Sequence, residues 1–229
     1  MIQFITRKKV FETNATVAFE ISTLQKAMFE DDIDLFENEQ NKSAYEDLFD
    51  CKDLITEKVE RFYKVLSFDH AEIKTFTKII SEKLVLLLTA VEIKKLIVVA
   101  HLKQNLFGAN LQHKYPPVKK AFNNLEKITQ SRNYKEAFKI DIEDLTAFIE
   151  IFFWIERCDA SVPEYVFFFD EANRFAFNLC KDGNVHTIEF DREILSDSLL
   201  KEKQWYTIDG RCFDNFSKDG KIKGRITNT

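Results

Sequence analysis

The main change in the spacing of apolar residues along the chain comes at Pro163. From about residue 43 to residue 157, apolar positions recur in steps of three and four residues, which is typical of helices. After Pro163 they alternate with polar positions, which indicates strands. The pattern predicts an α+β protein. Its N-terminal two-thirds would be mostly helical, and a small antiparallel sheet would form the C-terminal end.

One long helix is predicted at the centre of the helical part. Asp69 and Glu72 form a capping signal, and apolar residues continue from there towards a stop at Gly108. Between residues 84 and 99 the apolar surface extends most of the way round the helix. We therefore expect the 69–107 helix to be surrounded by other elements, with a kink or break near Thr89–Glu92 because of its length.

Shorter elements are predicted on both sides of this helix. Residues 15–22 have the pattern of a strand, which would pair with the start of the chain. Another helix is expected to begin at Ser43, which forms a capping box with Glu46. Further helices are expected at about 118–130, 133–138 and 142–157.

The aromatic-rich segment 163–190 is predicted to form three consecutive antiparallel strands. Asp182-Gly183 is a strong signal for a two-residue hairpin turn, which would pair Leu179 with His186. This register would place Phe175, Phe177, Leu179, Ile188 and Phe190 on one face of the sheet. We interpret that face as part of the core. Regions 1–162 and 163–229 are expected to pack as one unit, because the linker between them is short.

Composition disfavours several classes of function. The net charge of −5 argues against broad binding of nucleic acid through its phosphates. The five glycines form no glycine-rich phosphate loop. The start of the chain has no signal-peptide pattern, and the longest apolar run is too short to span a membrane. The four scattered cysteines predict free thiols and a cytoplasmic location.

Catalytic and metal-binding motifs are not evident. Cys180 and His186 flank the predicted turn, but the two-residue turn would place them on opposite faces of the sheet. We therefore interpret them as a structural cysteine and a histidine at the rim of the sheet. No two histidines or cysteines have the local spacing of metal ligands, and no G-x-S-x-G motif occurs. The sequence predicts neither a metal site nor a cofactor.

An acidic segment is the clearest charge feature. Between Glu30 and Asp50 there are nine acidic residues and a single lysine. The segment is either a solvated surface or a negative surface that docks on the basic groove of a partner. Apolar residues among the acids would act as anchors. The partner-binding residues predicted on this basis are Asp31, Asp32, Ile33, Asp34, Leu35, Phe36, Glu37 and Glu39.

The leading hypothesis is a non-enzymatic regulator that binds another protein. Its most concrete form is an inhibitor or immunity-type protein that occludes a nucleic-acid-processing enzyme, as in counter-defence by phages and mobile elements. One alternative is an enzyme with Cys180, His186 or His101 in a cleft. The other is nucleic-acid binding by the basic C-terminal tail. Its residues predicted to contact phosphates or an acidic partner are Lys218, Lys221, Lys223 and Arg225.

Overall fold

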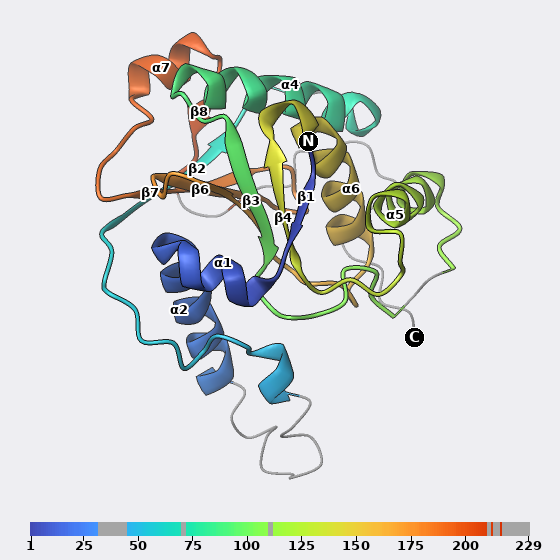
Figure 1. Ribbon diagram of the computed structural model, residues 1–229. Coiled ribbons are helices and arrows are strands. Elements are labelled where there is room, and N and C mark those ends of the chain that lie inside the picture. Colours follow the sequence, from blue (N-terminus) through green and yellow to red (C-terminus); the bar gives the residue numbers. More distant parts are fainter. Residues whose placement is uncertain (32–44, 70–71, 110–111, 210–211, 213–215, 217–229) are drawn as a thin grey trace.

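The protein is built on one large antiparallel sheet with helices on both of its faces (Figure 1). The computed structural model describes residues 1–31, 45–69, 72–109, 112–209, 212 and 216. Within these residues, eight strands lie in the order β1-β4-β3-β5-β6-β7-β2-β8.

The strands come from all parts of the described chain. They are β1 (Gln3–Ile5), β2 (Arg61–Ser67), β3 (Lys95–Ala100), β4 (Ala137–Asp141), β5 (Val166–Asp170), β6 (Phe175–Leu179), β7 (Val185–Phe190) and β8 (Tyr206–Thr207). The helices with defined bounds are α1 (Arg7–Thr13), α2 (Ala15–Asp31), α4 (Ile73–Ala90), α5 (Pro116–Thr129), α6 (Leu145–Cys158) and α7 (Asp197–Glu202), with a short 3-10 helix at Ile142–Asp144. Residues 45–48 are also helical.

Both faces of the sheet are buried in apolar cores. Because successive side chains of a strand point to opposite faces, the neighbours Phe168 and Phe169 on β5 belong to different cores. Phe168 lies in the larger core, to which α4, α5 and α6 contribute. Phe169 lies in the smaller core, which is closed by Val10 of α1 and Val17 of α2.

The prediction of a small C-terminal sheet was wrong. Four of the described strands, β1 to β4, precede residue 163, and the single sheet contains strands from both sides of that residue. The central strand β3 explains the error. Five of its six residues are buried, so it shows a continuous apolar run without the alternation that marks a half-exposed strand.

The prediction of one helix over 69–107 was wrong, but the break expected near Thr89–Glu92 is present. Helix α4 ends at Ala90, and Glu92 follows in a turn with a left-handed φ of 59°. The chain then enters β3, between β4 and β5. The apolar surface that seemed to surround a helix at 84–99 is therefore the end of α4 followed by a strand that is buried on both faces.

Other element predictions had mixed outcomes. Residues 15–22 lie within α2, and β1 pairs with β4 instead. Of the helix predicted from Ser43, a residue outside the described ranges, residues 45–48 are helical, and the chain has entered β2 by residue 61. The 133–138 helix does not form, and the chain there leads into β4. Helices α5 and α6 match the predictions at 118–130 and 142–157, and the three strands predicted in 163–190 form. In the described part of the chain, no helix is long and apolar enough to cross a membrane.

Candidate metal centre

The β6–β7 hairpin brings Cys180 and His186 onto the same face of the sheet. Asn178 pairs with His186, and the hairpin closes with a hydrogen bond of 2.9 Å from the Cys180 N–H to the Asn184 carbonyl. Three residues form the loop, and the last of them, Gly183, has a φ of 84°. This is the left-handed conformation that three-residue hairpin loops require. The loop is one residue longer than predicted, so the expectation that the two side chains lie on opposite faces was wrong.

The same shift in register changes which aromatic residues share a face. Phe175, Phe177 and Leu179 face the larger core, as the alternation predicted. Ile188 and Phe190 belong instead to the smaller core on the opposite face. The prediction that all five residues share one face was therefore wrong, although all five are buried.

Cys212 completes a group of three side chains that can bind a metal ion. Its Sγ lies 3.2 Å from Nε2 of His186. One ligand atom from each of Cys180, His186 and Cys212 lies within 4.8 Å of the other two. No other group of three or more His, Cys, Asp or Glu side chains meets this spacing among the residues that the structure describes.

The strands fix two of these three ligands. His186 lies on β7, which pairs with β6 on one side and with β2 on the other, where Val65 is its partner. Cys180 directly follows β6 and is hydrogen-bonded to the other end of the hairpin loop. Cys212 comes from the C-terminal segment beyond β8, far along the chain from the hairpin.

The spacing of the three ligand atoms is close to that of a zinc site. In tetrahedral coordination, Zn–S distances of about 2.3 Å and Zn–N distances of about 2.0–2.1 Å place the ligand atoms about 3.6–3.8 Å apart. Ligand atoms within 4.8 Å of one another therefore need to move by at most about 1 Å. Two thiols and one imidazole are also the ligand types that favour zinc over magnesium or calcium.

The cluster lines a pocket of about 180 Å³ that also contains carboxylates. Glu156, Glu164 and Asp182 lie on the wall of the pocket, and a carboxylate is a normal fourth ligand of zinc. Asp182 belongs to the hairpin loop, and its negative charge acts on the pKa of each of the three ligand groups. Its carboxylate lies outside the group of ligand atoms within 4.8 Å of one another, so the hairpin loop would have to bring it closer for it to take a fourth coordination position.

Burial favours the uncharged forms of the three side chains. It raises the pKa of the Cys180 thiol to about 11 and also raises the pKa of Cys212. It lowers the pKa of His186. A nucleophilic cysteine needs the opposite arrangement, a low-pKa thiolate beside a protonated histidine. The cluster fits metal ligands better, because thiols lose their protons when they bind a metal.

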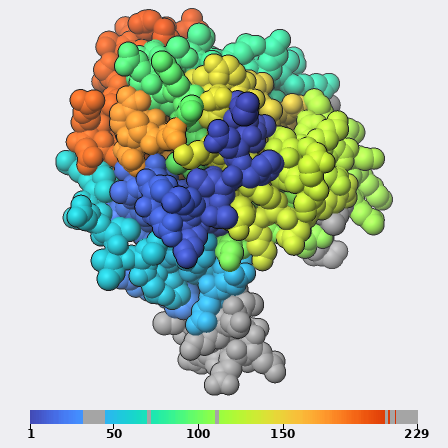
Figure 2. All heavy atoms as spheres, viewed as in Figure 1, coloured from blue at the N-terminus to red at the C-terminus, as the bar shows by residue number. Residues whose placement is uncertain are grey.

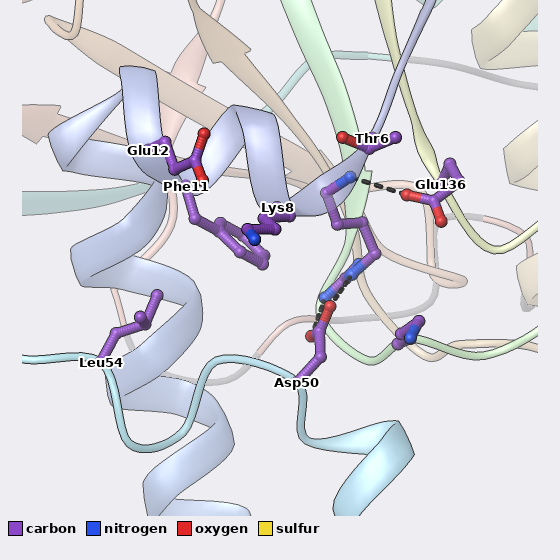
Figure 3. Close-up of a pocket in the computed structure, with 9 residues that line it drawn as sticks. Thr6, Lys8, Phe11, Glu12, Asp50, Leu54 and Glu136 are labelled. Carbon is purple, nitrogen blue, oxygen red and sulfur yellow. Dashed lines mark hydrogen bonds and ion pairs between the residues drawn. The ribbon is translucent and has the colours of Figure 1, made fainter.

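A second and larger hollow, the N-terminal cleft, lies beside α1. It has a volume of about 650 Å³. Figure 3 shows Phe11 and Leu54 on one side of it and Asp50 and Glu136 on the other. The Arg7 guanidinium is buried at its wall. It donates to both carboxylate oxygens of Asp50, at 2.8 and 2.9 Å, and to the Ala100 carbonyl at 2.6 Å.

Of the residues predicted to bind a partner, only Asp31 lies within the part of the chain that the structure describes. Asp31 ends α2 and is exposed. Outside the described residues lie Asp32, Ile33, Asp34, Leu35, Phe36, Glu37, Glu39, Lys218, Lys221, Lys223 and Arg225.

Two acids at the end of the acidic segment bind cations of this same chain. Asp47 contacts Lys103 at 2.8 Å and Lys135 at 3.5 Å, and its hydrogen bond with Lys103 is the main cause of its lowered pKa. Asp50 forms the ion pair with Arg7. These two acids therefore form ion pairs that connect the end of the acidic segment to other parts of the fold.

His101, the remaining candidate for an enzymatic site, is buried and 1% exposed. Its Nδ1 lies 3.1 Å from the Tyr165 carbonyl oxygen, and its ring packs against the Tyr165 ring. It lines neither the metal-centre pocket nor the N-terminal cleft. Packing explains its position.

No protein-family model, curated protein or solved structure matches this chain.

Proposed function

We propose that the protein binds a divalent metal ion of the zinc type through Cys180, His186 and Cys212. The observation that carries this proposal is the convergence of two thiols and one imidazole within 4.8 Å, at the wall of a pocket that also contains carboxylates. Asp182 is the proposed fourth ligand. Four protein ligands make a closed site, which is the pattern of structural zinc centres.

Metal titration of the purified, reduced protein tests this proposal. We expect one zinc ion per chain. Cobalt in its place should give the absorption bands of tetrahedral thiolate coordination. Cys180→Ala, Cys212→Ala and His186→Ala should each weaken zinc binding by on the order of 100-fold or more, because each removes a direct ligand.

Cys51→Ala is the matched control. Cys51 is also buried, but it lies in the smaller core and is hydrogen-bonded through its backbone N–H to Gln25. This variant should bind zinc like the wild type. Equal zinc affinity of Cys180→Ala, Cys212→Ala and Cys51→Ala would refute the proposed centre. A coordination position open to water would instead favour the enzyme alternative.

A second candidate function, binding of a protein partner, is favoured by an apolar rim at the N-terminal cleft. Leu54 lines the cleft and is 44% exposed, and the next residue, Ile55, is fully exposed. Figure 2 shows the N-terminal helices in blue beside the cyan segment that follows residue 45. Exposed apolar side chains ringed by charges are typical of protein interfaces. The inhibitor hypothesis therefore stays a proposal, with this rim as part of its contact surface.

A charge introduced on the rim tests this second candidate. Ile55→Asp should abolish retention of a stoichiometric protein partner in a pull-down. Leu86→Asp is the control, because Leu86 is 60% exposed but lies on α4, which packs on the other face of the sheet. If both variants retained the partner equally, the rim would not be the contact surface.

A further inference from the structure

The C-terminal segment touches the rest of the protein at three described positions, each four residues from the next. The Ile208 N–H donates to the Val65 carbonyl of β2 at 2.8 Å. Cys212 reaches His186 on β7. Phe216 is 3% exposed and belongs to the larger core. Cys212 is thus the middle one of three described contacts that hold this segment against the rest of the protein.

Phe216 is held by aromatic and cationic groups. Its ring meets those of Phe76 and Phe153 edge to face, with centroid distances of 4.8 and 5.7 Å. The Arg157 guanidinium lies 4.8 Å from the centroid of the same ring. Contacts of these kinds stabilise the buried ring in addition to the burial of its apolar surface.

Arg157 also connects this contact to the metal centre. It is fully buried, and its Nη1 donates to the carbonyl of Lys181 in the hairpin loop. That loop lies between two of the proposed ligands, Cys180 and His186. One buried side chain, Arg157, therefore contacts both Phe216 and the hairpin loop that carries two of the proposed ligands.

We infer that a metal ion bound at Cys180, His186 and Cys212 clamps the C-terminal segment onto the sheet, so that metal occupancy and docking of the segment control each other. The inference rests on the metal centre proposed above. Two of the ligands belong to the hairpin and the third belongs to the segment, so the complete set of ligands exists only when the segment is docked. Metal then stabilises the docked state.

The coupling must act in both directions. A change that weakens docking without touching a ligand should weaken metal binding, because only the docked fraction of molecules offers all three ligands. The metal should likewise protect the segment from opening. A cluster that only happens to lie near the segment would show neither effect.

Phe216→Ala tests the first direction. The substitution removes the ring contacts with Phe76 and Phe153 but none of the proposed metal ligands. If the docked fraction falls to about one-tenth, the apparent zinc dissociation constant rises about tenfold, and we expect at least this change. Phe216→Leu keeps most of the apolar contact and should show a smaller change. Phe122→Ala is the control, because Phe122 is buried on α5 and packs against Phe107 and His113.

Hydrogen exchange of the wild-type chain tests the second direction. Zinc should slow exchange in peptides from residue 204 onward, and Cys180→Ala should abolish this effect of zinc. If the wild type bound no zinc, the metal centre and the clamp would both be wrong. If zinc binding required the three ligands but Phe216→Ala kept its affinity and exchange did not respond to zinc, the clamp alone would be wrong.

Discussion

Removal of the carboxylate that faces Arg7 should destabilise the protein strongly. The Arg7 side chain is 1% exposed, and Asp50 accepts two of its hydrogen bonds, at 2.8 and 2.9 Å. Asp50→Ala would leave the guanidinium buried, with the Ala100 carbonyl as a neutral partner. A buried charge that loses its counter-ion costs about 3–5 kcal/mol of unfolding free energy.

The structure places the expected loss at the lower end of this range, about 3 kcal/mol. The Asp50 side chain is 16% exposed at the N-terminal cleft, so water can reach the space that the substitution creates. Two lost hydrogen bonds to a charged group, at about 1.5 kcal/mol each, give the same figure. The bond from Gln25 to Asp50 at 3.1 Å would be lost as well.

Urea unfolding followed by circular dichroism measures the effect, and the exposed pair of Lys120 and Glu150 supplies the control. Its N–O distance is 2.6 Å, but the two side chains are 64% and 31% exposed. Glu150→Ala should therefore cost no more than about 1 kcal/mol. Equal losses in Asp50→Ala and Glu150→Ala would refute the reasoning. The double variant Arg7→Leu, Asp50→Leu should recover much of the loss, because apolar groups can replace a buried pair at little cost.

Three further predictions concern the metal centre and a loop that packs on the end of α6. Apparent zinc affinity should rise about 100-fold per pH unit between about pH 6 and 8, because both thiols, whose pKa values are raised, release a proton when they bind the metal. Calorimetry that showed no dependence of zinc affinity on pH would contradict this. Gly108→Ala should cost about 2 kcal/mol in urea unfolding, because Gly108 has a φ of 61° and an added Cβ would collide with Oγ of Ser161; unchanged stability would contradict this. His113→Ala should also cost about 2 kcal/mol by the same measurement, because Nε2 of His113 lies 2.7 Å from the carboxylate of buried Asp159; wild-type stability would show that this contact contributes nothing.

The sequence predicted best those elements that have one face in the core. Helix α5 buries Val118, Ala121 and Leu125 at helical spacing and leaves its other face exposed, so its periodicity was clear. Helix α6 was found because its apolar run is long enough to exclude a single strand. Strand β3 failed for the opposite reason. With both faces buried, its apolar run does not distinguish a strand from the continuation of α4.

The structures of residues 15–22 and of β1 depend on tertiary contacts. Residues 15–22 have an apolar pattern compatible with a strand, and α2 buries Val17 and Ile21, four residues apart, against the smaller core. Strand β1 has only three residues and finds its partner in β4, more than 130 residues away. Neither outcome is visible in local spacing, because both depend on contacts with distant parts of the chain.

The arrangement of the proposed metal ligands depends on a single turn. The sequence shows that Cys180 and His186 are neighbours, but the two-residue turn that it predicts places them on opposite faces. A two-residue loop would separate Cys180 and His186, whereas the three-residue loop that ends at Gly183 places them together. Asp182-Gly183 is compatible with both loops, so the dipeptide does not decide between them. Cys212 carries no local signal, because its contact with His186 spans 26 residues and depends on how the segment after β8 returns to the hairpin. A metal centre whose ligands come from a hairpin and a distant segment forms only with the tertiary fold, and its ligand spacing therefore becomes visible in three dimensions.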